Sequence, residues 1–185
     1  KHMNILVIQN RMGIGDMVIF LPFVKAISKK YNSPVTLLIK ESTKANEYID
    51  NIKYIKKIIY LKRDSKNNQH NGLTGFFKLK NEIKDRLFDK VFIFNSSPRY
   101  RLICIIAGIK SIYQYPLFKK KGQHVIKAAQ KLLKKINLEV ESNPQIEIDK
   151  NSIKLAEQNL SISKNKINIL LGIGGSGPTK RIPAE

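Results

Sequence analysis

The sequence predicts an α/β protein built on a doubly wound, Rossmann-like parallel sheet. Short apolar runs alternate with stretches of helical periodicity along the 185 residues. The runs are continuously apolar, which is typical of strands that are buried on both faces. Strands that alternate with helices in this way favour a parallel sheet with helices on both sides. Ligands of such folds bind at the carboxyl ends of the strands. The loops that follow the strands are therefore where functional residues are expected.

The first strand and helix are predicted around the loop Gln9–Gly15. Asn4–Ile8 reads NILVI and is an apolar strand. Asp16 stands where the N-cap of a helix is expected. Pro22 follows soon after and predicts a kink or a short irregular start.

The remaining elements follow from the other apolar runs and from 3.6-residue periodicity. The expected strands are Val35–Ile39, Lys56–Leu61, Lys90–Phe94, Ser111–Tyr115 and Ile167–Leu171. The expected helices are Thr43–Ile49, Leu73–Leu87, Arg99–Ile109, Gln123–Ile136 and Asn151–Leu160. The loops Gln9–Gly15, Asn95–Arg101 and Lys62–Gly72 should then share the ligand edge of the sheet.

The chain is long enough for one domain and part of another. We expect residues 4–150 to form a Rossmann-like domain and residues 151–185 to begin a second one. Lys1-His2-Met3 resembles a vector remnant and is excluded. No apolar run is long enough to span a bilayer and no secretory signal is present. The single Cys104 indicates a reducing compartment, so a cytoplasmic protein is expected.

The net charge favours anionic partners. Lys and Arg number 34 against 14 Asp and Glu, a formal charge of +20. Nucleic acid, an acidic membrane surface and a phosphorylated glycan all fit this charge. An AT-rich genome would also produce abundant Lys, Asn and Ile, so the charge permits an anionic ligand without proving one. No aromatic stacking platform or known basic motif predicts a dedicated nucleic-acid site. A non-enzymatic basic module that binds nucleic acid or an anionic surface remains the alternative.

The last stretch, Ile167–Glu185, has the composition of a phosphate-binding loop. Its apolar run leads into four closely spaced glycines and then Thr179, Lys180 and Arg181. Glycines allow backbone N–H groups to point inward, and the two cations supply charge. The alternative is a flexible loop with two solvated cations.

Four further side chains lie in the predicted loops or at helix starts. Asp16 could act as a base at the mouth of the first strand, or could only cap a helix. Arg99 and Arg101 could clamp a phosphate or carboxylate, or could be the solvated start of a helix. His124 opens a helix, where a lone His is usually a surface or capping residue.

Several familiar motifs are absent. Val18 stands where a dinucleotide fingerprint needs its third glycine, which weighs against a nucleotide enzyme such as a sugar epimerase. Thr179 precedes Lys180 where a Walker A motif needs glycine. The chain has no Asp-x-Asp pair, no zinc cluster and no G-x-S-x-G.

The combination of segments resembles glycosyltransferase family 9, the bacterial heptosyltransferases and their relatives. The opening ILVIQNRMGIGDMVIFLPFVKAI is similar to the family's start, with Gly15-Asp16 and Pro22 at matching places. FDKVFIF and GIKSIYQYP resemble its fourth-strand region. GIGGSGPTKRIPAE resembles its phosphate loop, although Ile182 replaces the usual Trp. Met12-Gly13 also departs from the usual residues, which leaves the acceptor open. The resemblance covers about the first half of the family's length.

The resemblance implies a GT-B architecture, in which an N-terminal domain binds the acceptor and a C-terminal domain binds a nucleotide-sugar. By this resemblance Asp16 is the general base of an inverting, metal-independent transfer of a sugar, a heptose, to a lipopolysaccharide-type acceptor. The residues that hold the donor phosphates would be Ser176, Thr179, Lys180 and Arg181.

Other expectations concern the acceptor and the chain itself. The candidate acceptor-binding residues are Arg11, Arg99, Arg101 and His124. We expect no cofactor besides the donor substrate, and a phosphorylated glycolipid acceptor at the anionic inner membrane surface. The 185 residues alone are expected not to catalyse sugar transfer.

Overall fold

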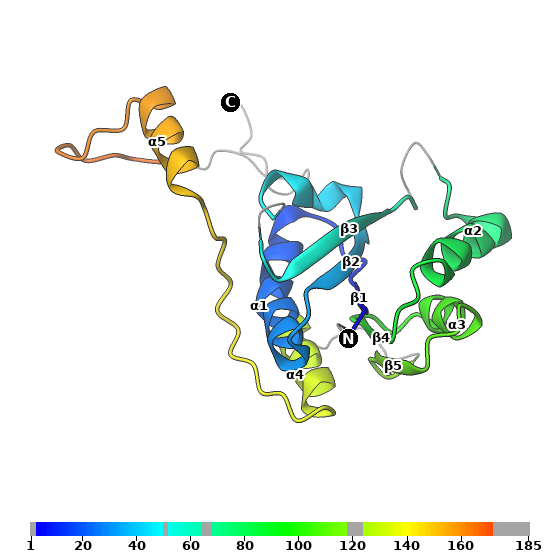
Figure 1. The fold of residues 1–185 in the computed structure, drawn as a ribbon. Helices are drawn as coiled ribbons and strands as arrows, with labels where there is room; N and C mark the ends of the chain where they lie inside the picture. The colour runs from blue at the N-terminus through cyan, green and yellow to red at the C-terminus, as the bar shows by residue number, and fades with distance from the viewer. Residues whose placement is uncertain (1–2, 50–51, 64–67, 118–123, 172–185) are drawn as a thin grey trace, which may run out of the picture. The chain divides into compact units, whose positions relative to one another are not determined.

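The computed structural model describes residues 3–49, 52–63, 68–117 and 124–171. The chain divides into two compact units, Lys1–Glu147 and Ile148–Glu185. The first unit holds a five-stranded sheet with the order β3-β2-β1-β4-β5 (Figure 1). Every pairing in the sheet is parallel. The doubly wound, Rossmann-like fold class predicted from the sequence is therefore confirmed.

The strands follow the apolar runs of the sequence closely. They are β1 (Ile5–Ile8), β2 (Val35–Lys40), β3 (Ile55–Leu61), β4 (Lys90–Ile93) and β5 (Ser111–Gln114). β1 lies in the middle, with Ile8 opposite Leu38 of β2 on one side and Ile93 of β4 on the other. All four residues of β1 are buried, as expected for a strand that is covered on both faces.

Two pairs of helices cover the two faces of the sheet. The helices of the first unit are α1 (Ile14–Tyr31), α2 (Gly72–Lys84), α3 (Pro98–Ile106) and α4 (Val125–Lys134). Ile5 and Val7 pack in one core cluster with residues of α1 and α4. Leu6 and Ile8 pack in the other, with residues of α2 and α3. Figure 1 shows the two pairs on opposite sides of the strands. The alternating side chains of one strand thus supply both cores.

Helix α1 runs through Pro22 without a break. It begins at Ile14, so Asp16 lies inside its first turn. The predicted N-cap role of Asp16 is therefore wrong, because Gly13 occupies the cap position and no side chain caps the helix. The helix ends at Asn32, which adopts a left-handed conformation with φ of 46°.

The helix predicted over Thr43–Ile49 does not form. Two 3-10 turns stand there instead, η1 (Glu41–Thr43) and η2 (Ala45–Glu47). Lys44 separates them with φ of 48°, a left-handed conformation that an α-helix cannot contain. The segment is nevertheless anchored, since Ala45 and Ile49 are buried in the core beside α1.

The second unit contains the helix α5 (Lys150–Asn159). Asp149 caps it by accepting hydrogen bonds from the N–H groups of Asn151 and Ser152. The strand predicted over Ile167–Leu171 is not observed, and these residues are exposed, Leu170 by 97%. A strand needs a neighbour for its backbone hydrogen bonds, and these residues pair with none of the described strands.

Candidate functional site at the switch point of the sheet

The connections out of β1 and β4 diverge at the carboxyl edge of the sheet. The chain leaves β1 into α1, on one face, and leaves the adjacent β4 into α3, on the opposite face (Figure 1). This divergence is a topological switch point, where open α/β sheets bind their ligands. The loops that start at Gln9 and Asn95 therefore border the expected crevice.

The loop after β1 is shaped by a buried glutamine and a glycine. Gln9 is 1% exposed, and its Oε1 accepts a hydrogen bond from the backbone N–H of Arg11. Gly13 then adopts φ of 103°, a conformation that residues with a Cβ rarely enter. This turn lets α1 begin directly afterwards, with Asp16 in its first turn.

Arg11 and Asp16 meet across this loop. Arg11 Nε donates to Asp16 Oδ1 at 2.7 Å. The side chains are 49% and 25% exposed, so both remain in contact with solvent. The first turn of a helix also stabilises a negative charge. The result is an oriented carboxylate at the ligand edge, with a second oxygen that can accept another hydrogen bond.

A second hydrogen-bonded turn lies at the ends of β4 and β5. Asn95 Oδ1 accepts from the N–H of Ser97 at 2.9 Å. Gln114 Nε2 donates to the carbonyl of Asn95 at 3.1 Å and to that of Ser97 at 2.8 Å. Because the backbone partners are unambiguous donors or acceptors, they fix which way both amides point. The turn is held rigidly to the end of β5.

Four side chains at this edge each leave one buried polar atom without a hydrogen-bond partner among the described residues. These atoms are Gln9 Nε2, Asn95 Nδ2, Gln114 Oε1 and the Tyr115 hydroxyl. Burial raises the pKa of Tyr115, so its hydroxyl stays neutral. An unpartnered buried polar atom costs about 1–3 kcal/mol. Because solvent does not reach these atoms at the ends of β1, β4 and β5, a ligand at this edge would not contact them directly.

The sequence analysis named none of these four residues as site candidates. A signal was nevertheless present, since Gln9 and Asn95 open two of the loops predicted at the ligand edge, and Gln114 and Tyr115 are the last two residues of a predicted strand. Polar residues at those positions are placed at the ligand edge by the fold itself.

Arg99 is engaged within the protein. Its Nη2 donates to the carbonyls of His70 at 3.0 Å and Gly72 at 2.9 Å, and its guanidinium lies 5.4 Å from the centre of the Phe76 ring. Burial, and then the nearby Arg63, lower the pKa of Arg99. Arg99 therefore fastens the turn before α2 to the start of α3. Its predicted clamp function stays a prediction, as does that of the half-buried Arg101 on the same helix.

Among the described residues, Arg11 is the candidate that forms an ion pair with Asp16. His124 is the exposed N-cap residue of α4, and its side chain makes no capping hydrogen bond. The predicted donor-phosphate residues lie outside the described residues; they are Ser176, Thr179, Lys180 and Arg181. Within the described residues, no group of three His, Cys, Asp or Glu side chains could hold a metal ion.

Comparison with solved structures identifies the fold. A glycosyl transferase family 9 protein from Veillonella parvula DSM 2008 superposes with a TM-score of 0.73 at 19% identity, over 99% of this chain and 57% of that one. This chain has the fold of a family 9 glycosyltransferase. The match agrees with the GT-B fold class predicted above and confirms, at the level of fold, the resemblance seen in the sequence.

Two Escherichia coli enzymes also superpose on this chain. ADP-heptose lipopolysaccharide heptosyltransferase II gives a TM-score of 0.59 at 14% identity, over 88% of this chain and 52% of that one. Heptosyltransferase WaaC, solved with ADP-2-deoxy-2-fluoro heptose, gives 0.55 at 10% identity, over 76% and 50%. The chain thus spans about half the length of these proteins.

No protein-family model matches the sequence, and neither does any curated protein. None of the described helices is long and apolar enough to cross a membrane.

Proposed function

We propose that this chain is the acceptor-binding part of a family 9 glycosyltransferase. The reaction moves a heptose from a nucleotide-diphosphate donor to a phosphorylated glycolipid of the lipopolysaccharide type, at the cytoplasmic side of the inner membrane. The carrying observation is the placement of Asp16 at the switch point of a family 9 fold, with Arg11 Nε bound to its Oδ1. The sugar and the acceptor are inferred from what the superposed enzymes act on.

Asp16 serves as the general base. One carboxylate oxygen is held by Arg11, and the other accepts the proton of an acceptor hydroxyl as its oxygen attacks the anomeric carbon. The bond to the donor diphosphate breaks at the same carbon with inversion, and the electron pair leaves with the diphosphate. Lys180 and Arg181, with the hydroxyls of Ser176 and Thr179, stabilise that charge without a metal ion.

The acceptor is bound beside Asp16 by the loops Gln9–Gly15 and Asn95–Arg101, at the ligand edge of the sheet. Arg101 is half-buried and His124 is exposed. Arg101 offers its guanidinium and His124 a ring N–H to the phosphates of the acceptor.

The test is a transfer assay with the gene product that contains this chain, an ADP-heptose donor and a deacylated lipopolysaccharide-core acceptor. Asp16→Asn should lower kcat by about 10²-fold or more, the usual contribution of a general base, and leave acceptor affinity nearly unchanged. Asp85→Asn is the matched control, since Asp85 is exposed at the end of α2. A wild-type kcat in the Asp16→Asn variant would show that Asp16 is not the general base.

A further inference from the structure

Helix α3 is apolar on the side that faces away from the sheet. Tyr100, Ile103 and Cys104 are its buried residues. On the opposite side, Leu102, Ile105 and Ile106 follow helical spacing and are 50%, 52% and 47% exposed. A helix that is hydrophobic on both sides is normally covered on both sides.

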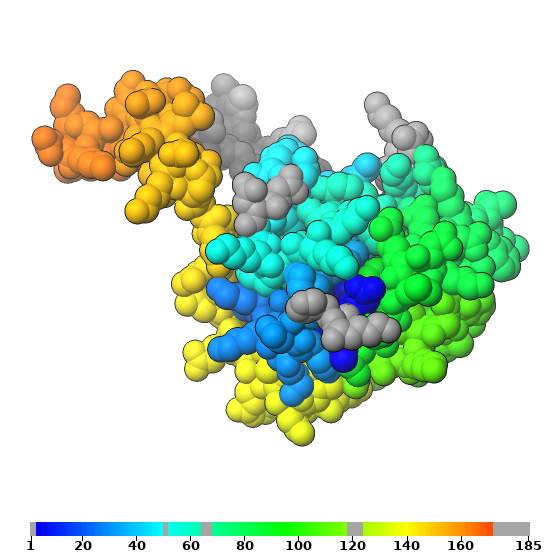
Figure 2. All heavy atoms as spheres, viewed as in Figure 1, coloured from blue at the N-terminus to red at the C-terminus, as the bar shows by residue number. Residues whose placement is uncertain are grey.

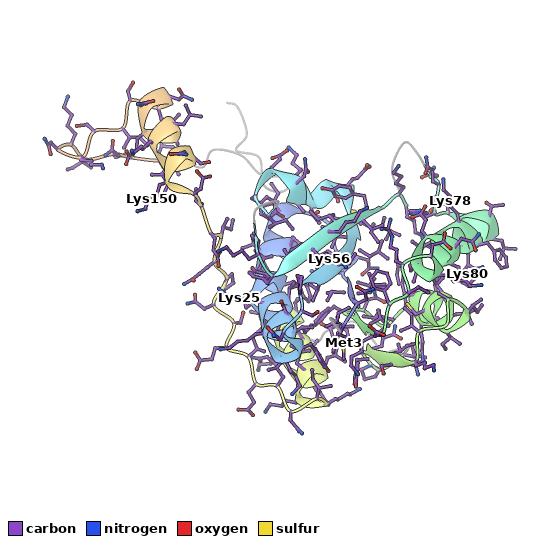
Figure 3. All side chains as sticks on the ribbon, in the orientation of Figure 1. Met3, Lys25, Lys56, Lys78, Lys80 and Lys150 are labelled. Carbon is purple, nitrogen blue, oxygen red and sulfur yellow. The ribbon has the colours of Figure 1, made fainter. Side chains whose placement is uncertain are left out.

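Helix α2, which packs against α3, adds a mixed stripe of apolar and basic residues. Leu73 and Phe77 are 79% and 54% exposed, and Lys80 and Lys84 continue the same stripe at helical spacing. Figure 2 shows the outer surface of these two helices in green, and Figure 3 shows Lys78 and Lys80 on α2. We call this region the α2–α3 surface. It consists of Leu73, Phe77, Lys80, Lys84, Leu102, Ile105 and Ile106.

The charge around this surface indicates the chemical class of its partner. Apart from Arg99, which is engaged within the protein, helices α2 and α3 carry four cations against one acidic residue, Glu82; the cations are Lys78, Lys80, Lys84 and Arg101. Exposed apolar side chains beside basic ones are the composition with which proteins lie on anionic bilayers.

We propose that the α2–α3 surface docks on an anionic lipid bilayer. The apolar side chains enter the boundary between headgroups and acyl chains, and Lys80 and Lys84 contact lipid phosphates. α3 begins at Pro98, directly after the turn Asn95–Ser97 that borders the site. Docking therefore holds the crevice next to the leaflet that carries a glycolipid. That consequence rests on the proposed function, whereas lipid binding itself does not.

The experiment measures partition of the full chain into vesicles of phosphatidylcholine, with and without phosphatidylglycerol. Binding should require phosphatidylglycerol and weaken as salt is added. Leu102→Gln/Ile105→Gln/Ile106→Gln should lower the partition coefficient by on the order of tenfold or more. Lys80→Gln and Lys84→Gln should each lower it by roughly fivefold. Binding that is independent of phosphatidylglycerol would overturn the proposal.

A matched control separates this surface from general hydrophobicity. Ile153, Leu155 and Leu160 on or next to α5 are 44%, 58% and 69% exposed, and their change to Gln should leave partition unchanged. An equal loss in that variant would overturn the proposal. Circular dichroism should show both variants folded, because exposed residues are replaced. If the α3 variant instead converts a dimer into a monomer by sedimentation, the surface joins two copies and the proposal is wrong.

Activity distinguishes this proposal from the proposed function. The α3 variant should transfer sugar normally to a soluble acceptor and poorly to the same acceptor anchored in vesicles. Vesicle binding without any transfer would contradict the proposed function and leave the docking surface intact.

Discussion

Arg11 Nε lies 2.7 Å from Asp16 Oδ1, across the loop that joins β1 to α1. Gly13, with its φ of 103°, folds this loop back so that the two side chains can meet. Solvent reaches both partners, and exposed ion pairs contribute little to stability. The pair therefore matters for the direction in which the carboxylate points.

Arg11→Ala should change the free energy of unfolding by less than about 1 kcal/mol but lower kcat, because Asp16 loses the group that orients it. Arg11→Lys should restore part of the kcat. Urea unfolding and steady-state kinetics measure the two effects. Lys25→Ala is the control, because Lys25 also forms an exposed ion pair, in which its Nζ lies 3.1 Å from Glu147 Oε1. This pair lies away from the site. An unchanged kcat in Arg11→Ala would contradict the positioning role.

Gln114 and Tyr115 are neighbours with opposite expected responses. Gln114→Leu leaves two carbonyls without their donor and should lower the free energy of unfolding by about 1–3 kcal/mol. Tyr115→Phe removes a hydroxyl that has no partner among the described residues and keeps the ring 6.0 Å from that of Phe94. Its stability should be unchanged or higher. Equal losses in the two variants, by urea unfolding, would show that the hydroxyl is hydrogen-bonded.

Substitutions of two helical glycines, Gly75 and Gly15, test how tightly α2 packs against the turn that precedes it. A Cβ on Gly75 would lie 2.2, 2.5 and 2.8 Å from backbone atoms of His70, whereas one on Gly15 would have nothing within 4 Å. Gly75→Ala should destabilise the protein by about 1–3 kcal/mol, because backbone must move. Gly15→Ala should stabilise it by up to about 1 kcal/mol, the difference in helix propensity. Thermal melting compares the two, and equal melting temperatures would contradict the close approach.

The protein should lose stability at alkaline pH, because burial raises the pKa of one thiol and two phenol groups. Burial raises the pKa of Cys104 from 9.0 to about 12, and burial with nearby anionic groups raises those of Tyr48 and Tyr54 from 10.0 to about 12. The folded state then holds more protons than the unfolded state between these values. Stability should be complete below the unfolded pKa values and fall as the pH approaches 12.

Urea unfolding across neutral and alkaline pH measures this fall, and Tyr54→Phe should make it shallower. A flat profile would show that the three groups titrate alike in both states. The Cys104 thiol should react with alkylating reagents only in the unfolded protein, because its side chain is fully buried.

The strands were predictable because burial on both faces leaves a simple mark. After the first residue of each segment, Asn4 or Lys90, NILVI and KVFIF contain only apolar residues, and both became strands at the centre of the sheet. The prediction of a helix over Thr43–Ile49 was wrong because apolar spacing over one turn cannot distinguish an α-helix from 3-10 turns. The prediction of a strand over Ile167–Leu171 was wrong because an apolar run does not indicate whether a partner strand is present.

The site was predictable only in part. Asp16 could be placed near the first strand, but its pairing with Arg11 depends on the turn at Gly13. The grouping of the buried polar side chains Gln9, Asn95 and Gln114 depends on β4 lying between β1 and β5. Strand order is set by tertiary packing, which the local sequence does not encode.

The strand order also has a consequence for synthesis on the ribosome. β1 is the first strand to be made, yet it lies in the middle of the finished sheet. β2 can pair with one edge soon afterwards, but the other edge waits until Lys90–Ile93 have emerged. During that interval an apolar strand edge is open to pairing with other chains. The nascent protein is then most exposed to aggregation and most in need of a chaperone.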